Sequence, residues 1–521
     1  MSTAAAEAGS PGGLPAALPN FALRLILIAI ADAFALLLGV SLINDGNVFL
    51  GATILVTALL LTIVNILPNL WPLRWMTPAL ALIALLVIYP FGYTFYIAFT
   101  NYSDGHRYAR AEALQLMSRE KYLPEGEASY SWEIFRNEAG EYALWLSNEN
   151  ETLFATTTTI TLVETAGEIP ESYEGYTLLT GGERFRALGD VQGAAFGDPN
   201  NPVGVASRSA AGTFRQRWVW DESRGVLMDM ENNIPYRADD TTGSFVAPNG
   251  STAPLGYWVP VGLNNFARIF SDSLIAGPLV RIFLWTVAFA FFSVFTSFVV
   301  GLFMAIVLNR SFPGVRVVRS LLIIPYAVPG MISILIWRGM LNPNLGVIAT
   351  NIENIFGWSP PFLTDPGWAK FSVLLVNLWL SYPYFMLICS GALQAIPSAI
   401  YEAAEVDGAN ARQKFFGLTL PLLLVSVGPL LIASFTYNFN NFLLIEALTR
   451  GGPAMAGTSA PPVGHTDNLI SYVFRFAFGA GGSRDYGFAS AIAIIIFVLV
   501  GLLTIIQFRF SKRLEEIGEN V

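Results

Sequence analysis

Eight long apolar runs dominate this sequence of 521 residues and limit what it can fold into. A helix needs about 20 residues to cross the hydrocarbon core of a bilayer, and each run is of that length or longer. Because no water in that core can pair with backbone groups, such runs form helices. With 54% hydrophobic and 13% charged residues, the chain is expected to be an all-α polytopic membrane protein. The runs lie near residues 21–43, 51–69, 74–99, 278–308, 318–340, 370–392, 418–447 and 486–508.

The basic residues are unevenly divided between the connections, and this division predicts the orientation. The short connections on one side carry Arg74, Arg310, Arg316, Arg319, Arg412 and Lys414. The opposite loop at 44–50 carries no Lys or Arg. Positive charge is retained on the cytoplasmic side of membrane proteins. We therefore expect both termini and the loop near residue 400 to be cytoplasmic.

Residues 101–277 separate the third run from the fourth, and a structureless connection of that length is uncommon. Segment 101–280 carries 24 acidic and 13 basic residues, which suits a solvated domain on the outer side. Stretches 152–163 and 213–220 are rich in β-forming residues and are bounded by turn residues. The predicted organisation is three helices in 1–100, an inserted, mainly β domain in 101–277, and five helices in 278–521. The single cysteine, Cys389, lies in the sixth run, so no disulfide is expected.

Two membrane runs carry a stripe of polar side chains on one helical face. The sixth run places Asn377, Ser381 and Tyr384 at i, i+4 and i+7, with Leu380 beside them. The seventh run places Ser434, Tyr437, Asn438 and Asn441 at i, i+3, i+4 and i+7. Lipid cannot pair with these groups, so they face protein, water or a ligand. Asparagine matches the paired donors and acceptors of sugar hydroxyls, but hydrogen bonds between helices would also explain the stripes.

The connection between these two runs, residues 393–421, reads as a short helix, a glycine break, a second helix and a Leu420-Pro421 re-entry into the membrane. Its Glu-Ala-Ala, Gly and Leu-Pro elements resemble, in order and spacing, the EAA loop of ABC-importer permeases; the alternative is an ordinary connecting loop. The resemblance implies that this loop docks into an ATPase subunit. The implied coupling residues are Glu402, Ala403, Ala404, Asp407 and Gly408.

Further stretches resemble the larger membrane subunit of maltose/maltodextrin ABC importers, the MalF type. They are residues 97–103, Pro325-Tyr326-Ala327-Val328-Pro329, residues 379–384, residues 433–442 and the turn at 448–453. The layout of eight spans with a large insert after the third is also similar to that subunit. The resemblance implies the fold of a type I ABC-importer permease with a periplasmic insert.

The same resemblance implies a function and a sugar site about midway through the membrane. Asn377, Leu380, Ser381, Tyr384, Ser434, Tyr437, Asn438 and Asn441 match the family's sugar contacts. Ser381 and Tyr437 replace a Gly and a Phe of the family, and each adds a hydroxyl. We expect a permease subunit that moves maltose/maltodextrin-type sugars across the bacterial inner membrane by alternating access. The implied partners are a second, smaller permease, two ATPase subunits, a periplasmic sugar-binding protein and membrane lipid.

Catalytic signals are nearly absent from the sequence. None of the four lysines follows a glycine, so there is no phosphate-binding loop, and ATP and Mg are expected on the partner ATPase. His106 and His465 are the only histidines, and we expect no enzyme, resident cofactor, metal site or nucleic-acid partner. Asp32 and Glu446 lie at membrane depth, where charges often mark ion pathways, so an ion-coupled secondary transporter of sugars is the alternative. Such a carrier would have no use for the EAA-like loop.

Overall fold

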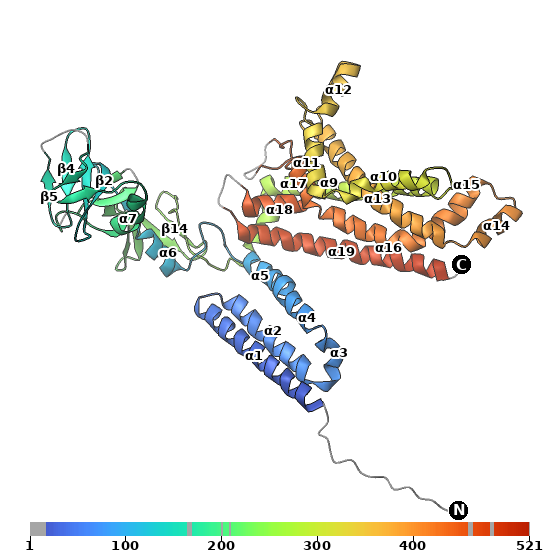
Figure 1. Ribbon diagram of the computed structural model, residues 1–521, viewed down its shortest axis with the longest axis horizontal. Coiled ribbons are helices and arrows are strands. Elements are labelled where there is room, and N and C mark those ends of the chain that lie inside the picture. Colours follow the sequence, from blue (N-terminus) through green and yellow to red (C-terminus); the bar gives the residue numbers. More distant parts are fainter. Residues whose placement is uncertain are drawn as a thin grey trace, which may run out of the picture. The chain divides into compact units, whose positions relative to one another are not determined.

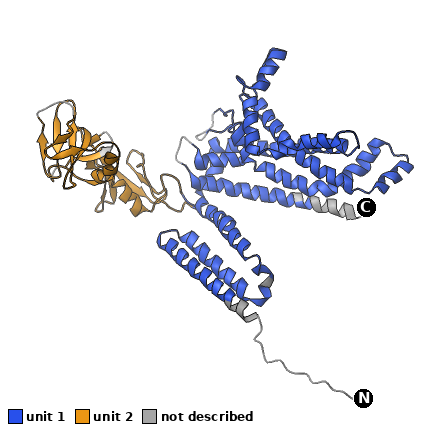
Figure 2. Ribbon diagram, in the orientation of Figure 1, with its two compact units in different colours: residues 1–100, 262–521 blue, residues 101–261 orange. Residues whose placement is uncertain are grey.

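The computed structural model describes residues 17–163, 169–199, 202–207, 210–456, 462–479 and 484–519. The chain divides into two compact units, shown in different colours in Figure 2. One unit consists of Met1–Thr100 and Gly262–Val521, and the other is the insert Asn101–Val261. The predicted cytoplasmic ends, residues 1–16 and 520–521, lie outside the described residues.

The first unit is helical (Figure 1). Among the described residues, seven helices are long and apolar enough to cross a membrane, or eight if one bent pair counts as a span. The N-terminal helices are α1 (Ala17–Asn44), α2 (Val48–Ile66), α3 (Trp71–Arg74), α4 (Thr77–Ile83), the π-helix η2 (Ala84–Ile88) and α5 (Tyr89–Ala98). After the insert come α8 (Asn264–Ser271), α9 (Ser273–Leu308), α10 (Val315–Ala327), α11 (Gly330–Met340), α12 (Val347–Phe356) and α13 (Pro366–Ala395). The last are α14 (Ser398–Val406), α15 (Ala411–Lys414), the π-helix η3 (Phe415–Thr419), α16 (Leu420–Phe439), α17 (Phe442–Leu448), α18 (Leu469–Phe478) and α19 (Tyr486–Glu519).

Two of the predicted spans are broken helices. The run predicted at 318–340 consists of α10 and α11, which meet at an angle of 92°. Val328 and Pro329 lie between them, Val328 in an extended conformation, and Pro329 cannot donate a backbone hydrogen bond. The run predicted at 418–447 ends as a regular helix at Phe439, and α17 begins after Asn440 and Asn441. The Asn441 side chain accepts from the Leu444 backbone N–H at 3.2 Å and so caps α17, as asparagine does at helix N-termini.

The longest helices approach each other closely at glycine. A Cβ atom on Gly301 of α9 would lie 2.6 Å from the Cβ of Phe385 and 2.7 Å from the backbone nitrogen of Met386, both on α13. Only glycine therefore permits this spacing between α9 and α13. The contact fixes the position of α13, which carries the first polar stripe.

The helices α1 and α2 pack through small residues and one polar pair. A Cβ on Gly51 would lie 2.5 Å from the backbone oxygen of Gly39. At membrane depth, both carboxylate oxygens of Asp32 accept from the Thr62 hydroxyl, at 2.7 and 2.8 Å. Asp32 therefore has a packing role between two helices.

The insert ends earlier than predicted. Residue 277 lies inside α9, whereas the compact insert ends at Val261. Between them, α8 belongs to the helical unit, because its buried Asn265 donates to the backbone oxygens of Ala98 and Thr100 at 2.9 and 2.8 Å. The sequence prediction set the end of the insert at the start of the fourth apolar run. It assigned α8 to the insert because this short helix is amphipathic and is not a membrane span.

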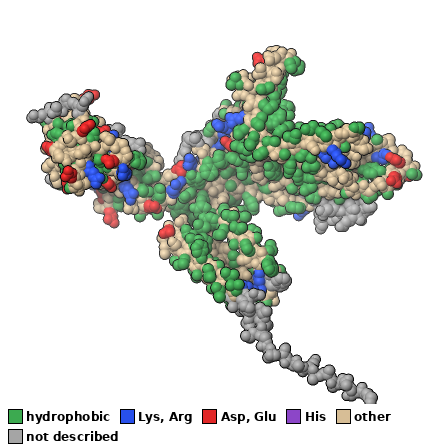
Figure 3. Space-filling model, viewed as in Figure 1, with side chains coloured by type: hydrophobic (Ala, Val, Ile, Leu, Met, Phe, Trp, Pro, Cys, Tyr) green, Lys and Arg blue, Asp and Glu red, His purple; other side chains and the backbone are tan. Residues whose placement is uncertain are grey.

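The insert is built on two antiparallel sheets, with two further strand pairs. Its surface in Figure 3 is rich in charged side chains, whereas the surface of the helical unit is mainly hydrophobic. The six-stranded sheet has the order β5-β4-β3-β2-β7-β6 and the four-stranded sheet has the order β11-β12-β13-β14. Alternate residues of β2 enter different cores, Ile134 on the face covered by α7 and Phe135 on the other, as a strand's period of two requires. The first elements are α6 (Arg110–Met117), β1 (Lys121–Tyr122), β2 (Ser131–Asn137), β3 (Tyr142–Ser147), β4 (Thr152–Ala155), β5 (Ile160–Leu162), β6 (Ser172–Tyr173), β7 (Tyr176–Leu178) and α7 (Gly181–Gly193). The remaining strands are β8 (Gly204–Ser207), β9 (Ala210–Gly212), β10 (Arg215–Gln216), β11 (Trp218–Asp221), β12 (Val226–Asp229), β13 (Ile234–Asp239) and β14 (Ser244–Val246).

One buried carboxylate organises the four-stranded sheet. Asp229 is 1% exposed and pairs with the Arg217 guanidinium, Nη2 to Oδ2, at 3.3 Å. It also accepts from the Asn232 side chain at 2.9 Å. Burial acts to raise the pKa of Asp229, but the hydrogen bonds from Asn232 and Arg217 outweigh it and lower the pKa. The charged form is therefore the one that stabilises the fold.

The ends of the insert are joined to each other, which predicts that it folds alone. The Asn101 backbone N–H donates to the Val259 backbone oxygen at 3.2 Å. The Asn101 side-chain oxygen accepts from the Val259 N–H at 2.9 Å. Residues 101–261 expressed without the helices should give a β-type circular dichroism spectrum and one cooperative thermal transition. A random-coil spectrum would contradict an independent domain.

The same fragment tests the charge of Asp229. Asp229→Asn removes the charge that Arg217 faces and should lower the free energy of unfolding at pH 7 by about 1–3 kcal/mol. The pKa of Asp229 is lower in the folded state than its value of about 3.9 in the unfolded chain. The stabilisation by the Asp229 charge is therefore present above that unfolded pKa and is lost as the pH falls through the folded pKa. The difference between variant and parent, measured by urea denaturation, should therefore shrink below about pH 4. Glu222→Gln, at an exposed carboxylate, is the control and should change stability little.

Candidate functional site

A cavity of about 540 Å³ lies within the helical unit, between α13, α16, α17 and the break that joins α10 to α11. All eight residues predicted to contact substrate line it. They are Asn377, Leu380, Ser381 and Tyr384 on α13, Ser434, Tyr437 and Asn438 on α16, and Asn441 between α16 and α17. The volume is in the usual range of small-molecule sites, roughly 300–1,000 Å³. The two polar stripes, 50 or more residues apart in the chain, therefore face a common space.

Some amide atoms of the cavity asparagines are hydrogen-bonded within the protein, and others have no partner among the described residues. Asn438 donates to the Ser434 backbone oxygen at 2.9 Å, and Asn441 Nδ2 lies 3.5 Å from Asn377 Oδ1. Asn377 and Asn438 are 2% and 4% exposed. Within the described part of the chain, Asn377 Nδ2 and Asn438 Oδ1 are buried without a hydrogen-bond partner. Leaving a buried polar atom unpaired costs about 1–3 kcal/mol, so these atoms favour a polar ligand.

Two tyrosine side chains provide part of the remaining cavity surface. Tyr384 lies on the same face of α13 as Asn377 and lines the cavity. Tyr437 on α16 also lines the cavity, and 71% of its surface is exposed. Tyrosine rings offer an apolar face and a hydroxyl at the edge. The arrangement can therefore hold a compact molecule that carries both hydroxyls and C–H surfaces.

The bend between α10 and α11 supplies cavity residues that the polar stripes did not reveal. Pro325, Tyr326, Val328 and Gly330 line the cavity from this side. The two prolines of the Pro325–Pro329 stretch were the available signal, since proline ends a helix and leaves backbone exposed. Irregular backbone at membrane depth is tolerated where it lines a cavity, and this bend does so.

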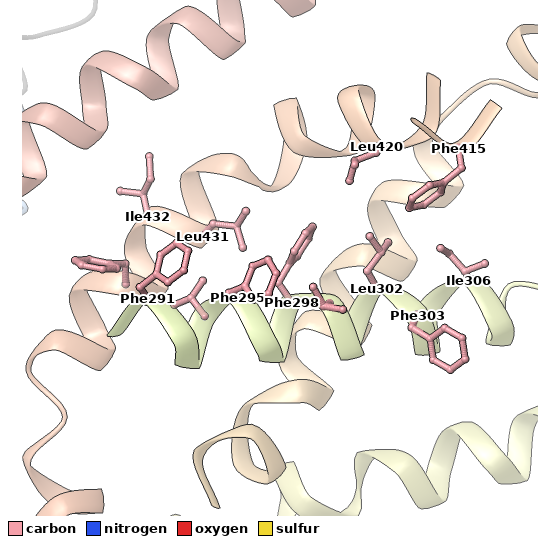
Figure 4. A pocket seen from close by; sticks show the side chains of 13 residues that line it. Phe291, Phe295, Phe298, Leu302, Phe303, Ile306, Phe415, Leu420, Leu431 and Ile432 are labelled. Carbon is pink, nitrogen blue, oxygen red and sulfur yellow. The ribbon is translucent and has the colours of Figure 1, made fainter. Parts of the chain in front are cut away.

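A second cavity, of about 640 Å³, has a different chemistry (Figure 4). It lies between α9, η3 and α16, and all 13 lining residues are apolar, among them Phe291, Phe298 and Leu431. A sugar there would find no partner for its hydroxyls. The surface suits hydrocarbon, which agrees with the expected lipid contact.

The loop predicted to couple to an ATPase forms the helical hairpin α14–α15. Gly408 has φ +75°, a conformation that side-chain-bearing residues rarely adopt, and it separates the two helices as predicted. Glu402, Ala403, Asp407 and Gly408 are exposed, whereas Ala404 is half-buried. The tip of the hairpin therefore offers a small, charged surface to a partner.

Two bonds that sequence reasoning missed hold this hairpin together. Lys414 Nζ lies 2.6 Å from Glu405 Oε1, and its hydrogen bond lowers the pKa of Glu405. The hydroxyls of Tyr401 and Thr419 lie 3.0 Å apart. Since α15, η3 and α16 form one apolar helical stretch from Ala411 to Phe439, the hairpin is joined directly to the cavity helix.

Among the described residues, no group of three or more His, Cys, Asp and Glu side chains could hold a metal ion. The geometry defines a polytopic helical membrane protein with a polar cavity among its helices and an exposed helical hairpin, features that suit a transport permease. Two family models match: the binding-protein-dependent transport system inner membrane component over residues 297–516, and the N-terminal of the TM subunit in PBP-dependent ABC transporters over residues 81–159.

Full-length relatives narrow the class. The chain is 37% identical over 458 residues to the maltose/maltodextrin transport system permease protein MalF of Vibrio vulnificus (strain YJ016), covering 84% of this chain and 85% of that protein. It is 35% identical over 457 residues to MalF of Escherichia coli (strain K12), covering 84% and 87%. The chain therefore belongs to the MalF family of ABC-importer permeases.

Family membership confirms several predictions. The chain is a multi-pass inner membrane protein and the permease subunit of an importer, not its ATPase, so the ion-coupled carrier is set aside. A solved bacterial ABC transporter for the import of alginate is 21% identical with a TM-score of 0.42, covering 48% of this chain and 84% of that one. That score is too low to bear on function.

Proposed function

We propose that this permease carries maltose/maltodextrin-type sugars through the cavity between α13, α16 and α17. The observation that supports it most is the convergence of all eight predicted contacts on one cavity at membrane depth. The unpaired Asn377 Nδ2 and Asn438 Oδ1 offer one donor and one acceptor, and a sugar hydroxyl can both accept and donate. The relatives are maltose/maltodextrin transport system permease proteins, which agrees with this substrate class.

Coupling to ATP hydrolysis is assigned to the α14–α15 hairpin. Its exposed Glu402, Asp407 and Gly408 would contact an ATPase subunit, which would also bind ATP and Mg. The internal Glu405–Lys414 bond holds the hairpin as one body, and the helix that follows it carries Ser434 and Asn438. A displacement of the hairpin would therefore move cavity residues, which is the mechanical requirement of alternating access.

The complex in which this would happen has further members. We infer a second, smaller permease, two ATPase subunits and a periplasmic sugar-binding protein. We infer that the hairpin and both termini are cytoplasmic and that residues 101–261 are periplasmic. The basic Arg310, Arg316 and Arg319, at the connection between α9 and α10, support this orientation through the positive-inside rule. The acidic insert would then offer its surface to the binding protein.

The sugar assignment is tested at Asn438. Asn438→Ala should reduce the uptake of labelled maltose by the assembled, reconstituted complex. The sugar hydroxyls lose a partner in a water-poor cavity, which weakens the free energy of sugar binding by about 1–3 kcal/mol. The melting temperature of the variant complex should stay close to that of the parent. Asn440→Ala, at an exposed asparagine outside the cavity, is the matched control and should leave uptake unchanged. Normal uptake with a lowered melting temperature in Asn438→Ala would make Asn438 a purely structural residue.

The coupling assignment is tested at the hairpin tip. Gly408→Leu forces a side chain into a left-handed conformation at a cost of about 1–2 kcal/mol, and Glu402→Lys reverses an exposed charge. Both should reduce the amount of ATPase subunit that co-purifies while the permease still inserts. Glu353→Lys on α12, at the other end of α13, is the charge-reversal control and should leave co-purification intact. Undiminished ATPase retention and sugar-stimulated hydrolysis in both tip variants would refute the docking role.

A further inference from the structure

The cavity residue Asn441 is held by a side chain that does not line the cavity. Asn468 Nδ2 donates to the Asn441 backbone oxygen at 2.9 Å, across 27 positions of the chain. Asn468 is fully buried, at 0% exposure. Asn441 lies in the break between α16 and α17, where the backbone is not fixed by a regular helix. A bond to this carbonyl therefore influences where the Asn441 side chain points.

The orientation of the Asn468 amide is itself determined by α18. Asn468 Oδ1 accepts from the Ser471 backbone N–H at 2.9 Å, and the Ser471 hydroxyl accepts from the Asn468 N–H at 3.0 Å. This capping box uses the oxygen of the amide. The nitrogen is thereby directed to Asn441.

The short loop segment at residues 464–467, directly before Asn468, is hydrogen-bonded to the turn after α17. The hydroxyls of Thr449 and Thr466 lie 2.7 Å apart, and Thr466 also donates to the Gly452 oxygen at 2.7 Å. The neighbouring Asp467, at 0% exposure, pairs with Arg475 of α18 at 3.1 Å. The loop, the turn and α18 thus form one bonded body, and Asn468 links that body to the cavity. Asn468 lies near the end of α16 that is remote from the α14–α15 hairpin.

From these contacts we infer that Asn468 is a positioning residue for the sugar site, which acts by holding Asn441 in line with Asn377. Asn441 Nδ2 lies 3.5 Å from Asn377 Oδ1, so a shift of Asn441 also alters the pairing of Asn377. The inference rests on the proposed sugar site. It adds that Thr449, Gly452 and Thr466, through the amide of Asn468, contribute to the geometry of the cavity.

Asn468→Ser tests this role, because serine still caps a helix but is too short to reach the Asn441 carbonyl. The readout is the Kd of labelled maltose for the purified, assembled complex without the binding protein, by equilibrium dialysis. The Kd should rise about two- to tenfold, the range expected for one hydrogen bond. The melting temperature, measured in parallel, checks that the variant complex is folded at the temperature of the dialysis. Asn440→Ser makes the same chemical change at the helix break, outside the cavity, and should leave the Kd unchanged.

A double-mutant cycle separates positioning from a general structural effect. If Asn468 acts through the Asn441 side chain, Asn468→Ser should raise the Kd no further in an Asn441→Ala background. An unchanged Kd in Asn468→Ser, additive effects in the double variant, or an equal rise in Asn440→Ser would each overturn the inference while leaving the sugar site intact. An unchanged Kd in Asn441→Ala alone would instead count against Asn441 as a sugar contact.

Discussion

The structure of the helical unit depends on one constraint: backbone groups at membrane depth find no water and need partners within the protein. Regular helices satisfy this over most of each span. Among the described spans, two places where the helix is interrupted are the 92° bend between α10 and α11 and the break between α16 and α17. Both breaks line the same cavity. The irregular backbone is thus concentrated where a substrate can bind, and the lipid-facing surface stays helical.

Side chains from other helices hydrogen-bond to backbone oxygens near both breaks. The Tyr382 hydroxyl donates to the Leu322 backbone oxygen at 2.9 Å, just before Pro325, and Asn468 donates to the Asn441 oxygen. These bonds connect α13 to α10 and α18 to α17. They fix the cavity while leaving Asn377 Nδ2 and Asn438 Oδ1 unpaired. The polar capacity that the protein does not use is then available for a sugar.

The coupling hairpin and the cavity are parts of one mechanical unit. The stretch from Ala411 to Phe439 begins at the hairpin and ends at the break beside Asn441. Gly301 lets α13, the opposite wall of the cavity, pack closely on α9. The hairpin is joined to both walls, because α14 follows α13 and η3 leads into α16. A force applied at the hairpin would therefore reach both sides of the cavity.

The sequence by itself determined the class, the spans, the inserted β domain and the residues of the polar stripes, because hydrophobic length and periodicity are local properties of the chain. Tertiary structure decided what no local pattern contains. It showed that Asn377 and Asn438 share a cavity and that Asn441 lies in a break and not on a continuous helix. It also showed that the insert ends at Val261, because Asn265 of α8 bonds to the backbone at the end of α5. The contribution of Asn468 was invisible in the sequence, since its partner is a backbone oxygen 27 positions away. Such pairings depend on how the helices pack, and packing is decided by the whole unit at once.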